Sequence, residues 1–135
     1  MKMKNVTIEY TYDGFEEFEE RFESFDELKR RLIEIKDQAS KIWDIIFSVD
    51  VVVENLGRIS IALDEKSILA FSNEEISLTS LGDPLAEGTT IYFFGDCSEM
   101  SNKYIIAYTD ALEALEFWIN TGELSKNIKW TDEIL

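Results

Sequence analysis

Alternation of apolar and polar residues is the main pattern in this chain. It occurs over residues 6–12, where the even positions are apolar, and again over residues 43–53, where the odd positions are apolar. Two further stretches with the same period, residues 59–63 and 67–71, follow after short runs of turn residues. A period of two is typical of a β-strand with one face in water, so these stretches predict strands, and the last three predict an antiparallel meander.

Three shorter stretches add to this sheet. Residues 89–94 and 104–106 are rich in aromatic and β-branched side chains and predict strands, and residues 76–78 predict a short strand at the edge of the sheet. Pro84, the one proline of the chain, lies in the run 82–88, which predicts an exposed loop.

Two other stretches repeat apolar residues at helical spacing. The first predicts a helix that follows Ser24, whose side chain caps it, with Glu27 completing a capping box. Its apolar stripe consists of Leu28, Leu32, Ile35 and Ala39. The second predicts a helix that Asp110 caps and Gly122 ends. Together these elements predict one α+β domain over residues 1–135, a mainly antiparallel β-sheet of about six strands with two α-helices packed against it.

The segment between the first strand and the first helix is ambiguous. Its phenylalanines have helical spacing, but its glutamates crowd one another with only Arg21 among them. The rings are Phe15, Phe18, Phe22 and Phe25. Rings at this spacing are more often core than interface, so we expect them to pack on the sheet. Two interpretations of the acids stay open: they simply face water, or they form a negative patch for a basic partner.

The charge of the chain narrows its partners. It has 28 acidic and 13 basic residues, a net charge of −15. Bare nucleic acid and anionic membrane surfaces would repel it, so we expect direct binding to neither. A protein that grips phosphate backbones is basic and would be complementary to it. An acidic surface also keeps many proteins in solution, so charge alone leaves both interpretations open.

The residue types argue against most catalytic chemistry. The chain has no histidine, which removes the commonest general base and the usual ligand of catalytic zinc. Its glycines are isolated and form no phosphate-binding motif. Cys97 lies close to Asp96 and Glu99, whose charges disfavour the thiolate that a nucleophile needs. The carboxylates match no calcium loop, so we expect no enzyme and no catalytic residue, cofactor or metal site.

The compartment is inferred from cysteine usage and the N-terminal residues. A single cysteine forms no intramolecular disulfide, which indicates a reducing compartment. Residues 5–9 are too polar for the apolar segment of a signal peptide, and no apolar run approaches the roughly 18 residues of a membrane span. We therefore expect a cytoplasmic protein without a membrane anchor.

The order of motifs over residues 91–130 resembles one known family. The motifs are the turn Phe94-Gly95-Asp96-Cys97-Ser98-Glu99 after an aromatic strand, the strand Tyr104-Ile105-Ile106, the segment Asp110-Ala111-Leu112-Glu113-Ala114, then Thr121-Gly122-Glu123 and Trp130. This order is similar to the C-terminal half of the Imm-one family of immunity proteins of bacterial polymorphic toxin systems. The chain departs from the family pattern at Ala107, where the family usually has proline, and at Thr131, where an acid usually follows the tryptophan.

The resemblance implies a protein that binds a cognate toxin domain and neutralises it by occluding its active site. Family members accompany several toxin classes, notably deaminase-like and nuclease domains, and the charge of this chain favours a basic, nucleic-acid-targeting one. Two alternatives stay open. The first is an acidic nucleic-acid mimic, or a general protein-interaction module, without a dedicated toxin. The second is a small enzyme that uses carboxylates and a metal.

The candidate toxin-binding residues are acids on expected loops or helix ends, selected by charge and exposure. They are Glu16, Glu17, Glu20, Glu23, Glu74, Glu75, Asp83, Glu87, Asp96 and Glu99. Within the turn that carries the resemblance, we expect Asp96 and Ser98 to bond to their own backbone and fix the turn. Trp118 and Trp130 are expected in the core, the latter on a short terminal strand beside the second helix.

Overall fold

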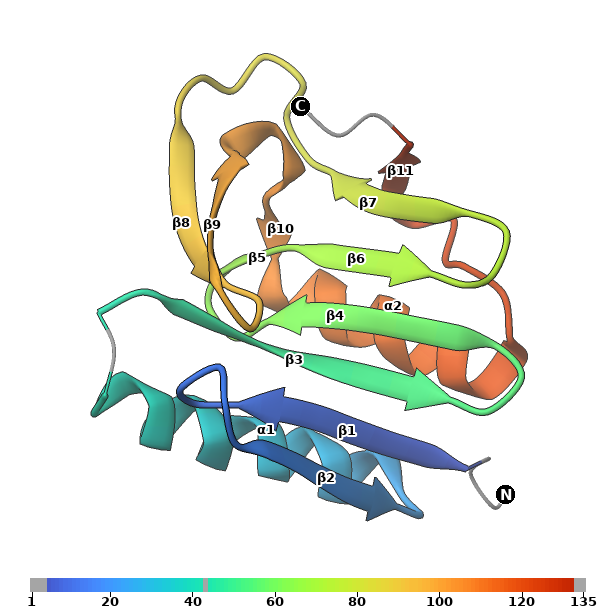
Figure 1. The fold of residues 1–135 in the computed structure, drawn as a ribbon. Coiled ribbons are helices and arrows are strands. Elements are labelled where there is room, and N and C mark those ends of the chain that lie inside the picture. Colours follow the sequence, from blue (N-terminus) through green and yellow to red (C-terminus); the bar gives the residue numbers. More distant parts are fainter. Residues whose placement is uncertain (1–4, 43, 133–135) are drawn as a thin grey trace.

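The computed structural model describes residues 5–42 and 44–132 of the chain. Within these residues, nine strands form one sheet and two α-helices pack on it (Figure 1). The elements are β1 (Val6–Thr11), β2 (Glu17–Phe22), α1 (Phe25–Ser40), β3 (Ile46–Val53), β4 (Gly57–Ala62), β5 (Lys66–Ser67), β6 (Leu69–Ser72), β7 (Ser77–Leu81), β8 (Thr89–Phe93), β9 (Cys97–Ser101), a 3-10 turn (Asn102–Tyr104), β10 (Ile106–Ala107), α2 (Tyr108–Thr121) and β11 (Lys129–Thr131).

The main path of the sheet runs β2-β1-β3-β4-β6-β7-β11 and is antiparallel throughout. At its beginning, β3 also pairs with β8, in parallel, and β8 carries β9 as a hairpin. Strands β5 and β10 form a separate pair. The expected α+β class and the meander of β3, β4 and β6 are confirmed.

Both helices lie on the same face of the sheet (Figure 1). The buried stripe of α1 is the expected one, Leu28, Leu32, Ile35 and Ala39, and α2 buries Ala111, Ala114, Leu115, Trp118 and Ile119. These side chains share one core with the apolar residues of the strands, such as Ile8, Val51 and Ile59. Neither of the two described helices lies on the opposite face of the sheet (Figure 1).

Two of the expected helix ends are confirmed. The Ser24 side chain accepts a hydrogen bond from the backbone N–H of Glu27 at 3.1 Å. Gly122 has the left-handed φ of 77° and donates to the carbonyl of Trp118 at 2.8 Å. The expected cap of the second helix is wrong, because α2 begins at Tyr108 and Asp110 lies in its first turn. There the negative charge of Asp110 stabilises the helix by interacting with the positive end of its dipole.

The ambiguous segment is a strand. β2 pairs with β1, and its alternation places Phe18, Glu20 and Phe22 on the helix side and the intervening residues in water. Phe18, Phe22 and Phe25 pack against the core as expected. Phe15 does not, because it lies in the β1–β2 turn and is exposed.

The sheet has more strands than the expected six, because short elements join it. The signature turn leads into β9, which was not expected as a strand, and β11 pairs with β7, so β7 is not an edge strand. Residues 104–106 contribute only the short β10 after the 3-10 turn. Trp130 lies on β11 and packs against the core, and Trp118 is buried, as expected. Trp43, placed at the start of a strand, lies outside the described residues.

Candidate protein-binding site

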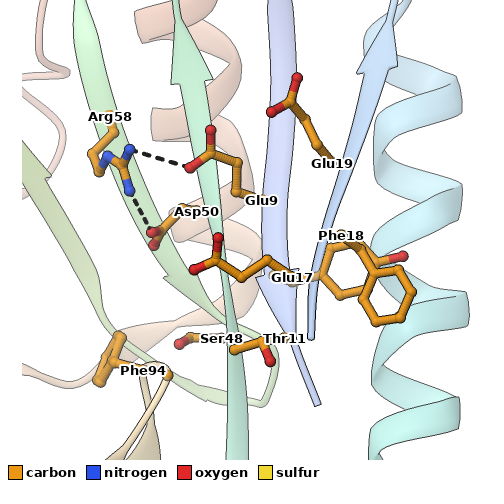
Figure 2. Close-up of a pocket in the computed structure, with 11 residues that line it drawn as sticks. Glu9, Thr11, Glu17, Phe18, Glu19, Ser48, Asp50, Arg58 and Phe94 are labelled. Carbon is orange, nitrogen blue, oxygen red and sulfur yellow. Dashed lines mark hydrogen bonds and ion pairs between the residues drawn. The ribbon is translucent and has the colours of Figure 1, made fainter. Parts of the chain in front are cut away.

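A hollow of about 410 Å³ opens on the face of the sheet that no helix covers (Figure 2). Its charged lining residues are Glu9, Glu17, Glu19, Asp50 and Arg58, which we call the acidic hollow. They come from β1, β2, β3 and β4, so their backbones are fixed by the sheet. The β8–β9 turn, through Phe94 and Gly95, lines the hollow as well.

The hollow exists because two strands share one edge of β3. β1 pairs with residues 50–53 of β3, and β8 pairs with Ile46 and Phe47. The other edge of β3 is taken by β4, since Leu63 donates to the carbonyl of Phe47. β1 and β8 therefore approach each other from opposite ends without joining. Ser48 lies in the gap between them and donates to the carbonyl of Phe93 at 2.6 Å.

Stacked aromatic rings hold the two sides of this gap together. On the helix side of the sheet, Tyr12 stacks on Phe47 with ring centroids 5.4 Å apart, and Phe47 stacks on Phe93 at 5.7 Å. The contacts link the end of β1 through β3 to the end of β8. Offset stacking adds to the burial of the rings, so the floor of the hollow is a packed layer.

The carboxylates of the hollow form a row across the sheet. Glu19 of β2 is directly opposite Glu9 of β1, and Glu9 is directly opposite Asp50 of β3. Cβ atoms of directly opposed residues are about 5 Å apart, and like charges at such positions destabilise a sheet. Three negative charges therefore stand side by side at a cost to the fold.

Arg58 neutralises part of this charge. Its Nη1 lies 2.8 Å from Oδ2 of Asp50 and its Nη2 lies 3.2 Å from Oε1 of Glu9 (Figure 2). Glu17 and Glu19 form no ion pair with another described residue, and Glu17 extends over the sheet towards Glu9 and Asp50 (Figure 2). Four carboxylates thus face one guanidinium, and the excess negative charge is concentrated on the side of β1 and β2.

Replacing Glu19 with glutamine is expected to stabilise the free protein. The change removes the repulsion between Glu19 and Glu9 while preserving shape, and a cross-strand pair of this kind contributes about 0.5 kcal/mol. Urea unfolding at low salt measures it, and added salt should reduce the difference. Glu65→Gln, on an exposed turn before β5, is the control with the same charge change. A lower stability of Glu19→Gln than of the wild type would contradict the repulsion.

The acids that the sequence suggested as toxin-binding residues lie at several separate places in the structure. Glu17 lines the hollow, Glu16 precedes it in the β1–β2 turn, and Asp96 follows Gly95 in the β8–β9 turn. Glu99 on β9 accepts a hydrogen bond from the Thr89 side chain at 2.5 Å. The remaining candidates lie elsewhere: Glu23 before α1, Glu74 and Glu75 in the β6–β7 turn, and Asp83 and Glu87 in the β7–β8 loop.

Glu20 lies on the helix side, away from the hollow. Nε of Arg31 on α1 is 2.7 Å from its Oε1, and Tyr10 donates to its Oε2. Arg31 also donates to the Tyr10 hydroxyl at 3.0 Å. This network ties β1, β2 and α1 together. Burial, together with the Glu20 charge, raises the pKa of Tyr10 to about 12, so the phenol stays protonated and donates.

The Glu20 network predicts a pH dependence of stability. Hydrogen bonds from Arg31 hold the pKa of the Glu20 carboxyl below the usual value of a glutamate. Because the folded pKa is the lower one, the stability from this network is fully present above the unfolded pKa of a glutamate, about 4.3, and is lost as pH falls through the folded pKa. Glu20→Gln should lower the free energy of unfolding by about 1 kcal/mol at pH 7. It should also reduce the fall of that free energy at acid pH, which we call the acid limb and which urea unfolding at several pH values measures. Glu23→Gln is the exposed control, and an unchanged limb in Glu20→Gln would contradict the assignment.

Sequence reasoning missed Glu9, Glu19, Asp50 and Arg58. Glu9 and Asp50 were visible as polar residues on the wet faces of predicted strands, and Glu19 lay in the ambiguous segment. Arg58 directly precedes the strand predicted over residues 59–63, and the register that aligns the four residues was not visible. The signature turn is held by the Ser98 hydroxyl, which donates to the Asp96 carboxylate at 3.1 Å, and by a backbone bond from Phe94 to the carbonyl of Asp96. The expected bonds from the Asp96 and Ser98 side chains to their own backbone are wrong, because these two side chains bond to each other instead.

The hollow is suited to hold cationic groups, since its carboxylates lie on strands fixed by the sheet and accept charge-assisted hydrogen bonds from guanidinium or ammonium groups. No group of three or more His, Cys, Asp or Glu side chains within residues 5–42 and 44–132 is arranged to hold a metal ion. Neither described helix is long and apolar enough to cross a membrane. The comparison with protein-family models gives no match for this chain, and the comparison with curated proteins gives none either.

Proposed function

We propose that this protein binds a basic partner protein through the acidic hollow. The observation that carries the proposal is the row of Glu19, Glu9 and Asp50 on an uncovered sheet face, with Arg58 as its one described counter-charge. Such a row costs stability in the free protein. Lysine or arginine side chains of a partner would remove that cost, so binding would be favoured by charge and by relief of repulsion.

The partner that we propose is a toxin domain, and the protein is its cytoplasmic immunity protein. The resemblance to the Imm-one immunity proteins supports this proposal. The turn that carries the resemblance contributes Phe94 and Gly95 to the lining of the hollow, so the signature and the charged row belong to one surface. A toxin that acts on nucleic acid has a basic substrate site, which is complementary to this surface.

Inhibition would follow from occupancy alone. The carboxylates of the hollow would take the place of substrate phosphates at the basic groups of the toxin, and the bound sheet face would exclude nucleic acid. An acidic surface speeds capture, and a few buried contacts slow release. Complexes between nuclease toxins and their immunity proteins are among the tightest known. Fast capture by charge and slow release through buried contacts can therefore produce an affinity high enough to inhibit a toxin.

Growth of cells that express the toxin domain encoded directly beside this gene tests the proposal. Co-expression of the wild-type chain should restore growth, and purified chain should bind the purified domain. A variant with Glu9, Glu17 and Glu19 changed to glutamine should restore growth poorly, whereas the same change at Glu74, Glu75 and Glu87 should not matter. Continued killing in the presence of soluble, folded wild-type protein would refute this pairing.

The net charge of −15 also favours a second function, an acidic mimic of nucleic acid without a dedicated partner. Salt separates the two. A mimic should bind unrelated basic proteins and lose nearly all affinity at about 0.5 M salt, because its contacts are solvated charges. A dedicated inhibitor should bind one toxin domain and keep nanomolar affinity there through desolvated contacts.

A further inference from the structure

One aromatic side chain extends into water from an ordered turn. Phe15 lies between β1 and β2 and is 90% exposed, more than any other large apolar residue described. The three phenylalanines that follow it in the sequence pack against the core. An exposed ring keeps the whole apolar area that burial against a partner would remove from water. Phe15 is therefore available for an intermolecular contact in a way that its neighbours are not.

The turn that carries Phe15 is fixed by hydrogen bonds. Oδ1 of Asp13 accepts the backbone N–H groups of Phe15 at 2.8 Å and Glu16 at 2.9 Å. Gly14 has the left-handed φ of 84° and donates to the Thr11 hydroxyl at 3.0 Å. The same N–H groups lower the pKa of Asp13, so its carboxylate is ionised at neutral pH. Because the backbone of this turn is already held, binding would order only the side-chain torsions of Phe15.

The turn also lies at the edge of the acidic hollow. A Cβ atom built on Gly14 would be 3.1 Å from the carbonyl oxygen of Gly95, so the β1–β2 and β8–β9 turns are in close contact. Thr11 and Glu17, the pair that closes the hairpin, line the hollow. Phe15 therefore stands beside a surface of fixed negative charge, an arrangement in which an aromatic anchor adjoins a charged rim.

We propose that Phe15 is the apolar anchor of the partner-binding surface. This inference rests on the proposed function and deepens it: the ring enters an apolar pocket of the basic partner while the hollow receives the lysine or arginine side chains beside that pocket. The negative charge around Phe15 favours a basic partner over the other candidates for this surface. A second copy of the chain would bring two acidic surfaces together, and an anionic membrane would be repelled by Glu16 and Glu17.

The test compares Phe15→Ala with Leu85→Ala. Leu85 is 86% exposed on the β7–β8 loop, which lies at the top of Figure 1, well away from the β1–β2 turn. Binding kinetics are measured with the purified toxin domain encoded beside the gene. Phe15→Ala should weaken binding about 30-fold or more, in the dissociation rate, because loss of an anchor speeds release and leaves the steering charges intact. Leu85→Ala should bind as the wild type does, and both variants should unfold at the wild-type urea concentration.

The outcomes separate this inference from the proposed function. Wild-type binding with an unchanged dissociation rate in Phe15→Ala overturns the anchor and leaves the proposed function standing. Absence of wild-type binding overturns both. Sedimentation of the wild type and of Phe15→Ala, each without the toxin domain, tests the other occupants. Self-association of the wild type that Phe15→Ala abolishes would assign the ring to a second copy, and association with phosphatidylserine-containing vesicles that Phe15→Ala abolishes would assign it to lipid. Either result overturns the proposal.

Discussion

Changing Glu17 and Glu19 together to lysine is expected to slow association with the toxin domain about 100-fold at low salt, with the fold retained. Both side chains lie on β2 and line the acidic hollow, and neither is ion-paired to another described residue. Steering by a concentrated field changes association rates by about 10- to 1,000-fold, and the double change reverses the larger part of this field. A lysine at position 19 would also face Glu9, so the sheet loses a repulsion.

The control for this prediction is Glu74→Lys with Glu75→Lys. It changes the net charge of the chain by the same amount but acts in the β6–β7 turn, whose two acids do not line the acidic hollow. Stopped-flow association at several salt concentrations gives the rates, and the two double variants should converge as salt rises. Equal slowing by both would mean that total charge, and not the hollow, attracts the partner.

The alternating strands were predictable because their core face is encoded locally. In β3 and β4, apolar side chains at every second position have no other way to be buried together, and the helix stripes follow the same argument. β2 was not predictable in this way. Phe18 and Phe22 are spaced for a helix, but they are also two strand periods apart, and pairing with β1 decides between the two structures.

The candidate site depends on contacts that are distant in sequence. Charge indicated an acidic surface, and the segment around Glu17 was named as one possible patch. The row of Glu19, Glu9 and Asp50 requires the register of three strands, and the hollow requires β8 to join β3 in parallel from a distant part of the chain. Composition also gives no means to distinguish Glu20, which pairs with Arg31 inside the fold, from its exposed neighbours.

The exposure of Phe15 was also not predictable from the sequence pattern. Helical spacing grouped it with three rings that are packed against the core, and the hydrogen bonds of Asp13 that place it outside depend on the turn geometry. A phenylalanine directly after Asp-Gly at a strand end is the local signal that could have separated it, because such a dipeptide favours a hairpin turn whose tip is in water.

Trp118→Ala is expected to destabilise the protein by about 3 to 5 kcal/mol, a large share of the roughly 5 to 15 kcal/mol that stabilises a typical domain. Trp118 is 1% exposed on the sheet side of α2, and its ring meets Phe71 edge to face with centroids 5.9 Å apart. Removing the ring leaves a cavity between α2 and the sheet.

Phe117→Ala is the matched control for Trp118→Ala. Phe117 is the preceding residue of α2 and is 41% exposed, so its loss should cost about 1 kcal/mol or less, which urea unfolding resolves. Because α2 and the acidic hollow lie on opposite faces of the sheet, the folded fraction of Trp118→Ala should associate with the toxin domain at the wild-type rate. A slower association of that fraction would show that the core beneath α2 shapes the binding face, and that the two faces are not independent.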